Sequence, residues 1–106
     1  MAQKSALGAD HYPRRMEHVV WKVIDGKGIL LNLESGAYFE VNPIGLSIWQ
    51  RCNGKTPLKN LIQSLAAEFA GQPTRVGKDA ASFISELKRR KLIEVSETAK
   101  ASATNS

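Results

Sequence analysis

The stretch Gly36–Trp49, GAYFEVNPIGLSIW, contains a short strand followed at once by the start of an amphipathic helix. Residues 37–41 alternate around aromatic side chains, which is the period-two pattern of a half-buried strand. Asn42 can cap the next helix through its side-chain oxygen, and Pro43 suits the first helical position. The apolar residues that then recur at helical spacing are Ile44, Ile48 and Trp49.

The predicted strand at residues 37–41 contains no proline and one charged residue, Glu40. Edge strands of natural proteins usually carry lysine, proline or a bulge that prevents pairing with other chains. If this strand lies at the edge of a sheet, it is therefore an open template for another chain.

Two more strands are predicted before it, at residues 19–24 and 29–33. Asp25-Gly26 is a strong hairpin signal between them, and Glu34-Ser35-Gly36 offers a second tight turn. The three strands form an antiparallel meander, whose first edge is blunted by Lys22 and whose third strand has no such guard. The residues expected to face the core are Trp21, Val23, Ile29, Leu31, Phe39 and Val41.

Three helices are predicted after the strands, which gives an α+β fold. The first spans residues 43–51 and ends at Asn53-Gly54. The second follows Thr56-Pro57 and is broken at Gly71 and Pro73, and the third spans residues 77–91.

Composition indicates one domain of 106 residues with a net charge of +5 and a sequence pI near 9.6. We expect a flexible segment at 1–18, a folded domain at 19–95 and a disordered tail at 96–106. No apolar run approaches the roughly 20 residues that span a bilayer. The single cysteine, Cys52, excludes an internal disulfide and favours a cytoplasmic location.

The sequence contains no pattern typical of catalysis. His11 and His18 lie near the N-terminus without a cysteine or carboxylate at metal-ligand spacing. Cys52 has no histidine partner within the folded part, so a nucleophilic thiol is not supported. We therefore predict a protein that is not an enzyme and has no metal and no cofactor.

The basic residues near the end of the third helix admit a winged-helix protein that reads DNA. A helix-turn-helix has a turn of three to four residues, whereas the predicted connection here, residues 70–76, is longer. The helix also opens with residues poorly suited to reading bases, and cations at a helix C-terminus offset the helix dipole in any case. Nucleic acid is therefore the alternative partner.

The favoured interpretation is peptide capture by strand addition at residues 37–41. Main-chain hydrogen bonds alone cannot bind tightly, because ordering the peptide costs a comparable free energy. A groove along the last helix would supply apolar anchors, with Phe83 and Leu87 at its floor unless these are ordinary core residues. The predicted rim, which would attract acidic peptides, consists of Lys88, Arg89 and Arg90.

The segments LLNLESGAYFEVNPIGLSIWQRCNGKTPLKNLI and FISELKRRKLIEV resemble the PqqD-like family of recognition domains for ribosomally made, modified peptides. The most telling elements are the aromatic strand into Asn42, the small Gly45, the aromatic Trp49, and the residues 53–56 before the second helix. The resemblance covers residues 19–95 and contains no catalytic signature.

The resemblance implies a winged-helix-like fold of three strands and three helices without enzymatic activity. It implies that a leader segment of a precursor peptide adds to the third strand and lies against the third helix, here residues 79–91. It also implies presentation of that peptide to a radical SAM enzyme or a protease. The implied edge residues are Ala37, Tyr38, Phe39, Glu40 and Val41. An unguarded edge also allows a homodimer when no peptide is present.

Overall fold

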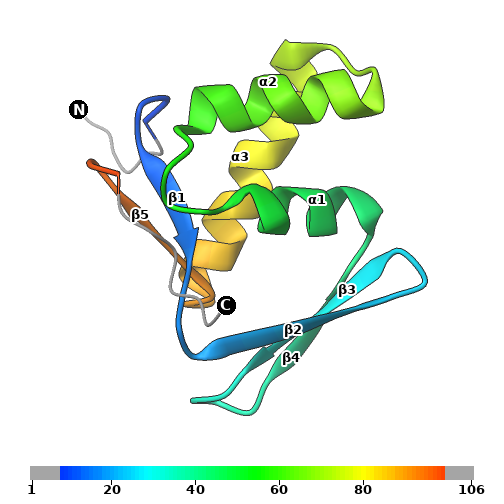
Figure 1. Cartoon of the computed structure of the whole chain (residues 1–106), viewed down its shortest axis with the longest axis vertical. Coiled ribbons are helices and arrows are strands. Elements are labelled where there is room, and N and C mark those ends of the chain that lie inside the picture. The colour runs from blue at the N-terminus through cyan, green and yellow to red at the C-terminus, as the bar shows by residue number, and fades with distance from the viewer. Residues whose placement is uncertain (1–7, 100–106) are drawn as a thin grey trace.

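The computed structural model describes residues 8–99. Strands β2, β3 and β4 form one antiparallel sheet in that order, the helices cover one face of it, and β1 pairs with β5 beside the helices (Figure 1). This arrangement confirms the predicted α+β, winged-helix-like fold. The elements are β1 (Tyr12–Arg15), β2 (Val19–Ile24), β3 (Lys27–Asn32), β4 (Tyr38–Val41), α1 (Pro43–Arg51), α2 (Leu58–Phe69), α3 (Pro73–Arg89) and β5 (Ile93–Ser96).

The junctions between the elements follow the predicted turn chemistry. The hairpin between β2 and β3 turns at Asp25 and Gly26, whose φ angles of 52° and 79° lie in the left-handed region that this turn requires. At the start of α1 the backbone N–H of Gly45 donates to Oδ1 of Asn42 at 2.8 Å. The predicted cap is therefore confirmed.

The sheet turns a different set of β3 side chains toward the helices than the sequence predicted. Leu30 pairs with Trp21 on one side and with Phe39 on the other, and directly paired residues share a face. Leu30 is fully buried, so the prediction that Ile29 and Leu31 face the core is wrong. Residues 29–31 are all apolar, and such a run fits either phase of a strand.

Trp21 and Val23 lie on the predicted face but remain 39% and 47% exposed. The hairpin of β2 and β3 extends beyond the helices, so its outer part has no layer to pack on (Figure 1). The inner part of the sheet packs on α1, where the fully buried Trp49 meets the edge of the Trp21 ring at a centroid distance of 6.3 Å.

The expectation of a flexible segment through residue 18 is wrong for β1, which pairs with β5 in an antiparallel ladder. Arg14 forms an ion pair with Glu94 at 3.1 Å across this ladder. Arg15 donates from Nη1 to the carbonyl oxygens of Trp49 and Gln50, and so satisfies the C-terminal end of α1. Two arginines in a polar segment do not form the alternating apolar pattern of a strand, so the sequence did not indicate these contacts. Residues 1–7 and 100–106 lie outside the described part, and Ser96 ends β5 rather than beginning the tail.

Helix α3 begins at Pro73, four residues before the predicted start. Proline breaks a helix in its interior, but it is favoured at the first helical position, which Pro73 occupies here. Ala70 ends α2 in the left-handed conformation, so residues 70–72 alone connect the two helices. The seven-residue connection was therefore wrong, and connection length does not argue against a helix-turn-helix.

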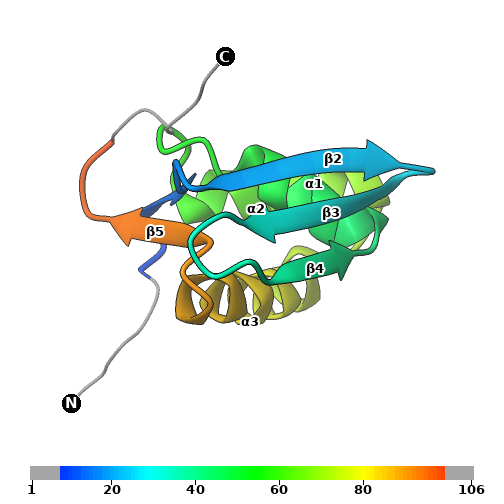
Figure 2. The same cartoon turned by 90° about the horizontal axis from the view of Figure 1, so that it is seen from below.

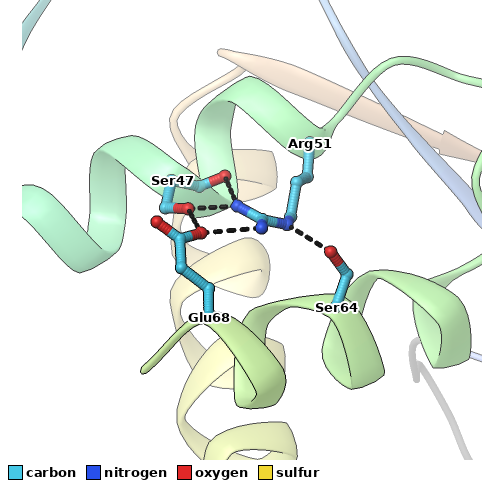
Figure 3. A network of polar contacts seen from close by, with 4 residues as sticks. All are labelled: Ser47, Arg51, Ser64 and Glu68. Atoms are coloured by element: carbon cyan, nitrogen blue, oxygen red, sulfur yellow. Dashed lines mark hydrogen bonds and ion pairs between the residues drawn. The ribbon is translucent and has the colours of Figure 1, made fainter. Parts of the chain in front are cut away.

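A polar network joins α1 to α2 (Figure 3). Arg51 donates to Glu68 at 2.7 Å and to Ser64 at 3.0 Å, and it also contacts the Ser47 hydroxyl, which donates to Glu68 at 2.9 Å. Because Ser47 is buried, its hydroxyl needs such a partner. The network fixes α1 against α2.

We expect acid to remove the contribution of this network to stability. Hydrogen bonds from Ser47 and Arg51 hold the pKa of Glu68 below its ordinary value of 4.5. A carboxyl whose pKa is lower in the folded state stabilises above its unfolded pKa, and this stabilisation is lost as pH falls through the folded pKa. A Glu68→Gln variant should therefore be less stable than the wild type at neutral pH and nearly equal to it in strong acid. Urea unfolding at both pH values measures this, and a constant difference would contradict it.

Among the helices of residues 8–99, none combines the length and the apolar character that crossing a bilayer requires.

Candidate functional site

Strand β4 is an edge of the sheet, as predicted. The N–H of Asn32 donates to the carbonyl of Ala37 at 2.9 Å, which makes these two a hydrogen-bonded pair. Such pairs alternate along an antiparallel ladder, so Phe39 and Val41 are the next residues that bond to β3. Tyr38 and Glu40 therefore direct their backbone N–H and C=O groups away from β3, toward the open side of β4.

Helix α3 runs along that open side (Figure 2). At one end the Arg90 guanidinium lies over the Phe39 ring, 4.4 Å from its centroid. Farther along, a side chain on Gly45 would meet Phe83 at 3.0 Å and Val41 at 3.2 Å, so α1 approaches both elements closely. Strand and helix therefore run in opposite directions, and we call the strip of surface between β4 and α3 the groove.

The groove opens at its far end into a cavity of about 440 Å³. Its walls come from the end of β4 and from all three helices, and most of them are apolar. The lining residues are Glu40, Val41, Asn42, Ile44, Gly45, Ile48, Leu65, Phe69, Val76, Asp79, Ala80 and Phe83. A cavity with this lining suits an apolar side chain.

The five predicted edge residues divide between two faces. Phe39 is half-buried and Val41 is buried on the helix side, while Tyr38 and Glu40 are exposed on the other side. Ala37 lies just before β4 and closes its ladder through its carbonyl. The side chain of Tyr38, 70% exposed, is therefore available to a partner on the outer face of the sheet.

The predicted residues of the last helix are not all in the groove. Phe83 lines the cavity, whereas Leu87 is buried in the core. Leu87 therefore fits the alternative interpretation, in which it is an ordinary core residue. Arg90 reaches the groove at Phe39, but Lys88 and Arg89 do not share its flank, because successive helical residues are about 100° apart. A peptide-binding role for Lys88 and Arg89 stays a prediction.

Several residues of the cavity were missed by sequence reasoning. Ile44, one of the predicted apolar positions of the first helix, and Phe69 both line the cavity and remain 47% and 37% exposed. Asp79 stood in the predicted helix without a role, yet it lines the cavity. The one available signal was Gly45, a glycine inside a predicted helix, which indicates a close approach of another element.

The groove has opposite charges at its two ends. Glu86 accepts hydrogen bonds from Arg89 and Arg90 at 2.6 Å each, and these bonds lower the pKa of its carboxyl. The guanidinium of Arg90 places a positive charge beside Phe39. At the cavity end the charged lining residue on the helix side is the acidic Asp79, while Glu40 borders the cavity with its side chain on the outer face.

Within residues 8–99, no group of three histidine, cysteine or carboxylate side chains is arranged to hold a metal ion. Cys52 is fully buried, its Sγ donates to the Ile48 carbonyl at 3.2 Å, and burial raises the pKa of its thiol to about 12. A buried, protonated thiol is a poor nucleophile.

We therefore expect Cys52 in the native protein to resist alkylation by iodoacetamide at neutral pH. After unfolding in urea, the thiol becomes accessible and its pKa returns toward the ordinary range, so labelling should be complete. Mass spectrometry of the two samples measures the difference. Stoichiometric labelling of the native protein would contradict the burial of this side chain.

Comparisons with known proteins agree with this geometry. The model of the family described as coenzyme PQQ synthesis protein D (PqqD) matches residues 27–93. No significant match was found among curated proteins. Among solved structures, "TbiB1 in Complex with the TbiA(beta) Leader Peptide" is 26% identical, with a TM-score of 0.70 over 76% of this chain and 94% of the other. "Lasso peptide synthetase B1 complexed with the leader peptide" is 23% identical and shares the fold, with a TM-score of 0.69 over 77% of this chain and 96% of the other.

Proposed function

Because this chain belongs to the PqqD family, we propose that it binds the leader segment of a ribosomally made precursor peptide by strand addition to β4 and presents it to a modifying enzyme. The observation that carries this proposal is the pair of outward-facing backbone units at Tyr38 and Glu40, beside an apolar cavity. The solved structure of TbiB1, which has the same fold, contains a leader peptide.

The cavity supplies binding free energy that hydrogen bonding to the strand edge alone does not provide. Each backbone hydrogen bond contributes only about 0.5–1.5 kcal/mol net, and ordering one peptide residue costs about 1–2 kcal/mol. Burying a leucine-sized side chain in the cavity contributes roughly 1.5–3 kcal/mol. Edge pairing therefore sets the direction and register of the peptide, and the buried anchor supplies most of the net affinity.

The competing proposal, a winged-helix protein that reads DNA, finds no support in the family or in the solved structures that resemble this chain. In that proposal the positive charge near Arg90 contacts phosphates. In ours, Arg90 belongs to the peptide groove because its guanidinium rests on Phe39 of the edge strand.

A domain that binds a precursor without modifying it needs a separate enzyme, and we propose a radical SAM enzyme or a protease in the cytoplasm, where ribosomal peptides are made. The exposed edge also allows two copies to pair through β4 when no peptide is present. Peptide should then convert a dimer into a monomer.

The experiment is a titration of ¹⁵N-labelled protein with the leader segment of a precursor encoded beside its gene. The amide resonances of β4 and of the groove side of α3 should move, and those of β1 and β5 should stay. A peptide that binds but moves only resonances of other elements would overturn the assignment of the site. A gel shift with duplex DNA, expected to be negative, tests the competing proposal.

A further inference from the structure

The groove beside β4 is charged in opposite senses at its two ends. Arg90 holds the end next to Phe39. Asp79 borders the cavity at the other end and is the charged lining residue on the helix side, because the side chain of Glu40 lies on the outer face of the sheet.

Both ends retain capacity for a guest. Arg90 uses its Nε–H on Glu86, and a guanidinium has further N–H donors on its two terminal amino groups. Asp79 is exposed and forms no ion pair with any residue in the 8–99 range. Glu40 pairs with Lys27 at 3.5 Å, but both side chains are more than half exposed, so this pair is weak.

The pleat of a strand fixes which guest side chains meet these groups. A guest residue opposite Val41 and a guest residue opposite Phe39 both point to the helix side, because directly paired residues share a face. The first faces the cavity and the second faces Arg90. One guest residue separates them and points to the outer face of the sheet.

We propose that this groove selects peptides by the order of the charged residues along their sequence, an inference that rests on the proposed function. The preferred peptide has a lysine or arginine two positions before an apolar anchor and an aspartate or glutamate two positions beyond it, so that all three side chains point to the helix side. Antiparallel pairing is the more stable arrangement, and β4 runs from the Arg90 end toward the cavity. The order from the N-terminus of the guest is therefore basic, any residue, apolar, any residue, acidic.

A displayed library of random peptides tests the charge order without knowledge of the natural ligand. Peptides selected by the wild type should carry a basic residue two positions before the anchor about fivefold more often than an acidic one, as expected for a partly exposed ion pair. Selection by Asp79→Lys should reverse that preference. The matched control is Ser85→Lys, which adds positive charge to the exposed flank of α3, about half a helical turn from Phe83.

A second variant tests the other end. Arg90→Gln removes the charge beside Phe39 while it keeps a side chain that can lie on the ring. Its selected peptides should lose the acidic residue two positions beyond the anchor and keep the basic residue before it. Circular dichroism verifies that each variant is folded.

The outcomes separate this inference from the proposed function. If the wild type selects peptides whose binding is lost in Tyr38→Pro but whose charges are unordered, the edge binds peptide and the inference is overturned. An order of charges that Asp79→Lys leaves unchanged overturns it equally. If no peptide is enriched, or if binding survives Tyr38→Pro, the proposed function fails and takes the inference with it. An order that reverses with Asp79→Lys and persists in Ser85→Lys supports it.

Discussion

Replacing Tyr38 with proline should weaken peptide binding at least about tenfold and leave the domain folded. Tyr38 directs its N–H away from β3, so proline removes no bond of the sheet. It removes one hydrogen bond to the guest, and its ring occupies the position from which the guest carbonyl would accept. Fluorescence anisotropy with a labelled peptide selected by the wild type measures the loss.

The sheet offers two matched proline controls. The N–H of Leu33 donates to the carbonyl of His18, and the alternation along β2 then leaves the N–H of Val23 on the opposite, outer edge of the sheet. Val23→Pro should therefore leave binding unchanged. Phe39→Pro removes a bond to β3 and should destabilise the sheet itself. Full affinity of a folded Tyr38→Pro variant would contradict the account of the edge.

Replacing Trp49 with alanine should cost about 3–5 kcal/mol in the free energy of unfolding. Trp49 is fully buried, belongs to the main core cluster and meets the ring of Trp21 from the sheet. The loss is a large part of the roughly 5–15 kcal/mol that stabilises an ordinary domain. Urea unfolding followed by circular dichroism measures it, and an unchanged midpoint would contradict the packing of α1 on the sheet.

A Trp49→Phe variant separates ring packing from polar contacts. In the described part of the chain, the Nε1–H of Trp49 is buried without a hydrogen-bond acceptor. Phenylalanine removes this unsatisfied donor and keeps an aromatic ring, so the loss of stability should be much smaller than for alanine. If Trp49→Phe and Trp49→Ala lost equal stability, the indole N–H would form a stabilising hydrogen bond in solution.

Local chemistry was sufficient to predict the junctions of the fold. Asp25-Gly26 supplies the left-handed residues of a tight hairpin, and Asn42-Pro43 supplies a cap and a fixed φ, so each junction depends on a few adjacent residues. The edge position of β4 followed from the order of strands in a meander. None of these features requires knowledge of a distant contact.

The features that were missed depend on distant contacts. The side chains of residues 29–31 are all apolar, and only packing on α1 decides that Leu30 is buried. Strand β1 exists because β5, at the other end of the domain, pairs with it. Likewise the cavity combines residues of four elements, and the role of Asp79 depends on its position in that lining. Periodicity within one segment does not encode such combinations.

Hydrogen exchange at two backbone amides shows whether β4 offers an open edge to the peptide. The N–H groups of Tyr38 and Glu40 point away from β3, so they should exchange rapidly in the peptide-free monomer, while the amides of Phe39 and Val41 are protected. Bound peptide should slow Tyr38 and Glu40 and leave the outward amide of Val23 unchanged. Protection of Tyr38 and Glu40 in the free monomer, or rapid exchange of both in the saturated complex, would contradict strand addition at β4.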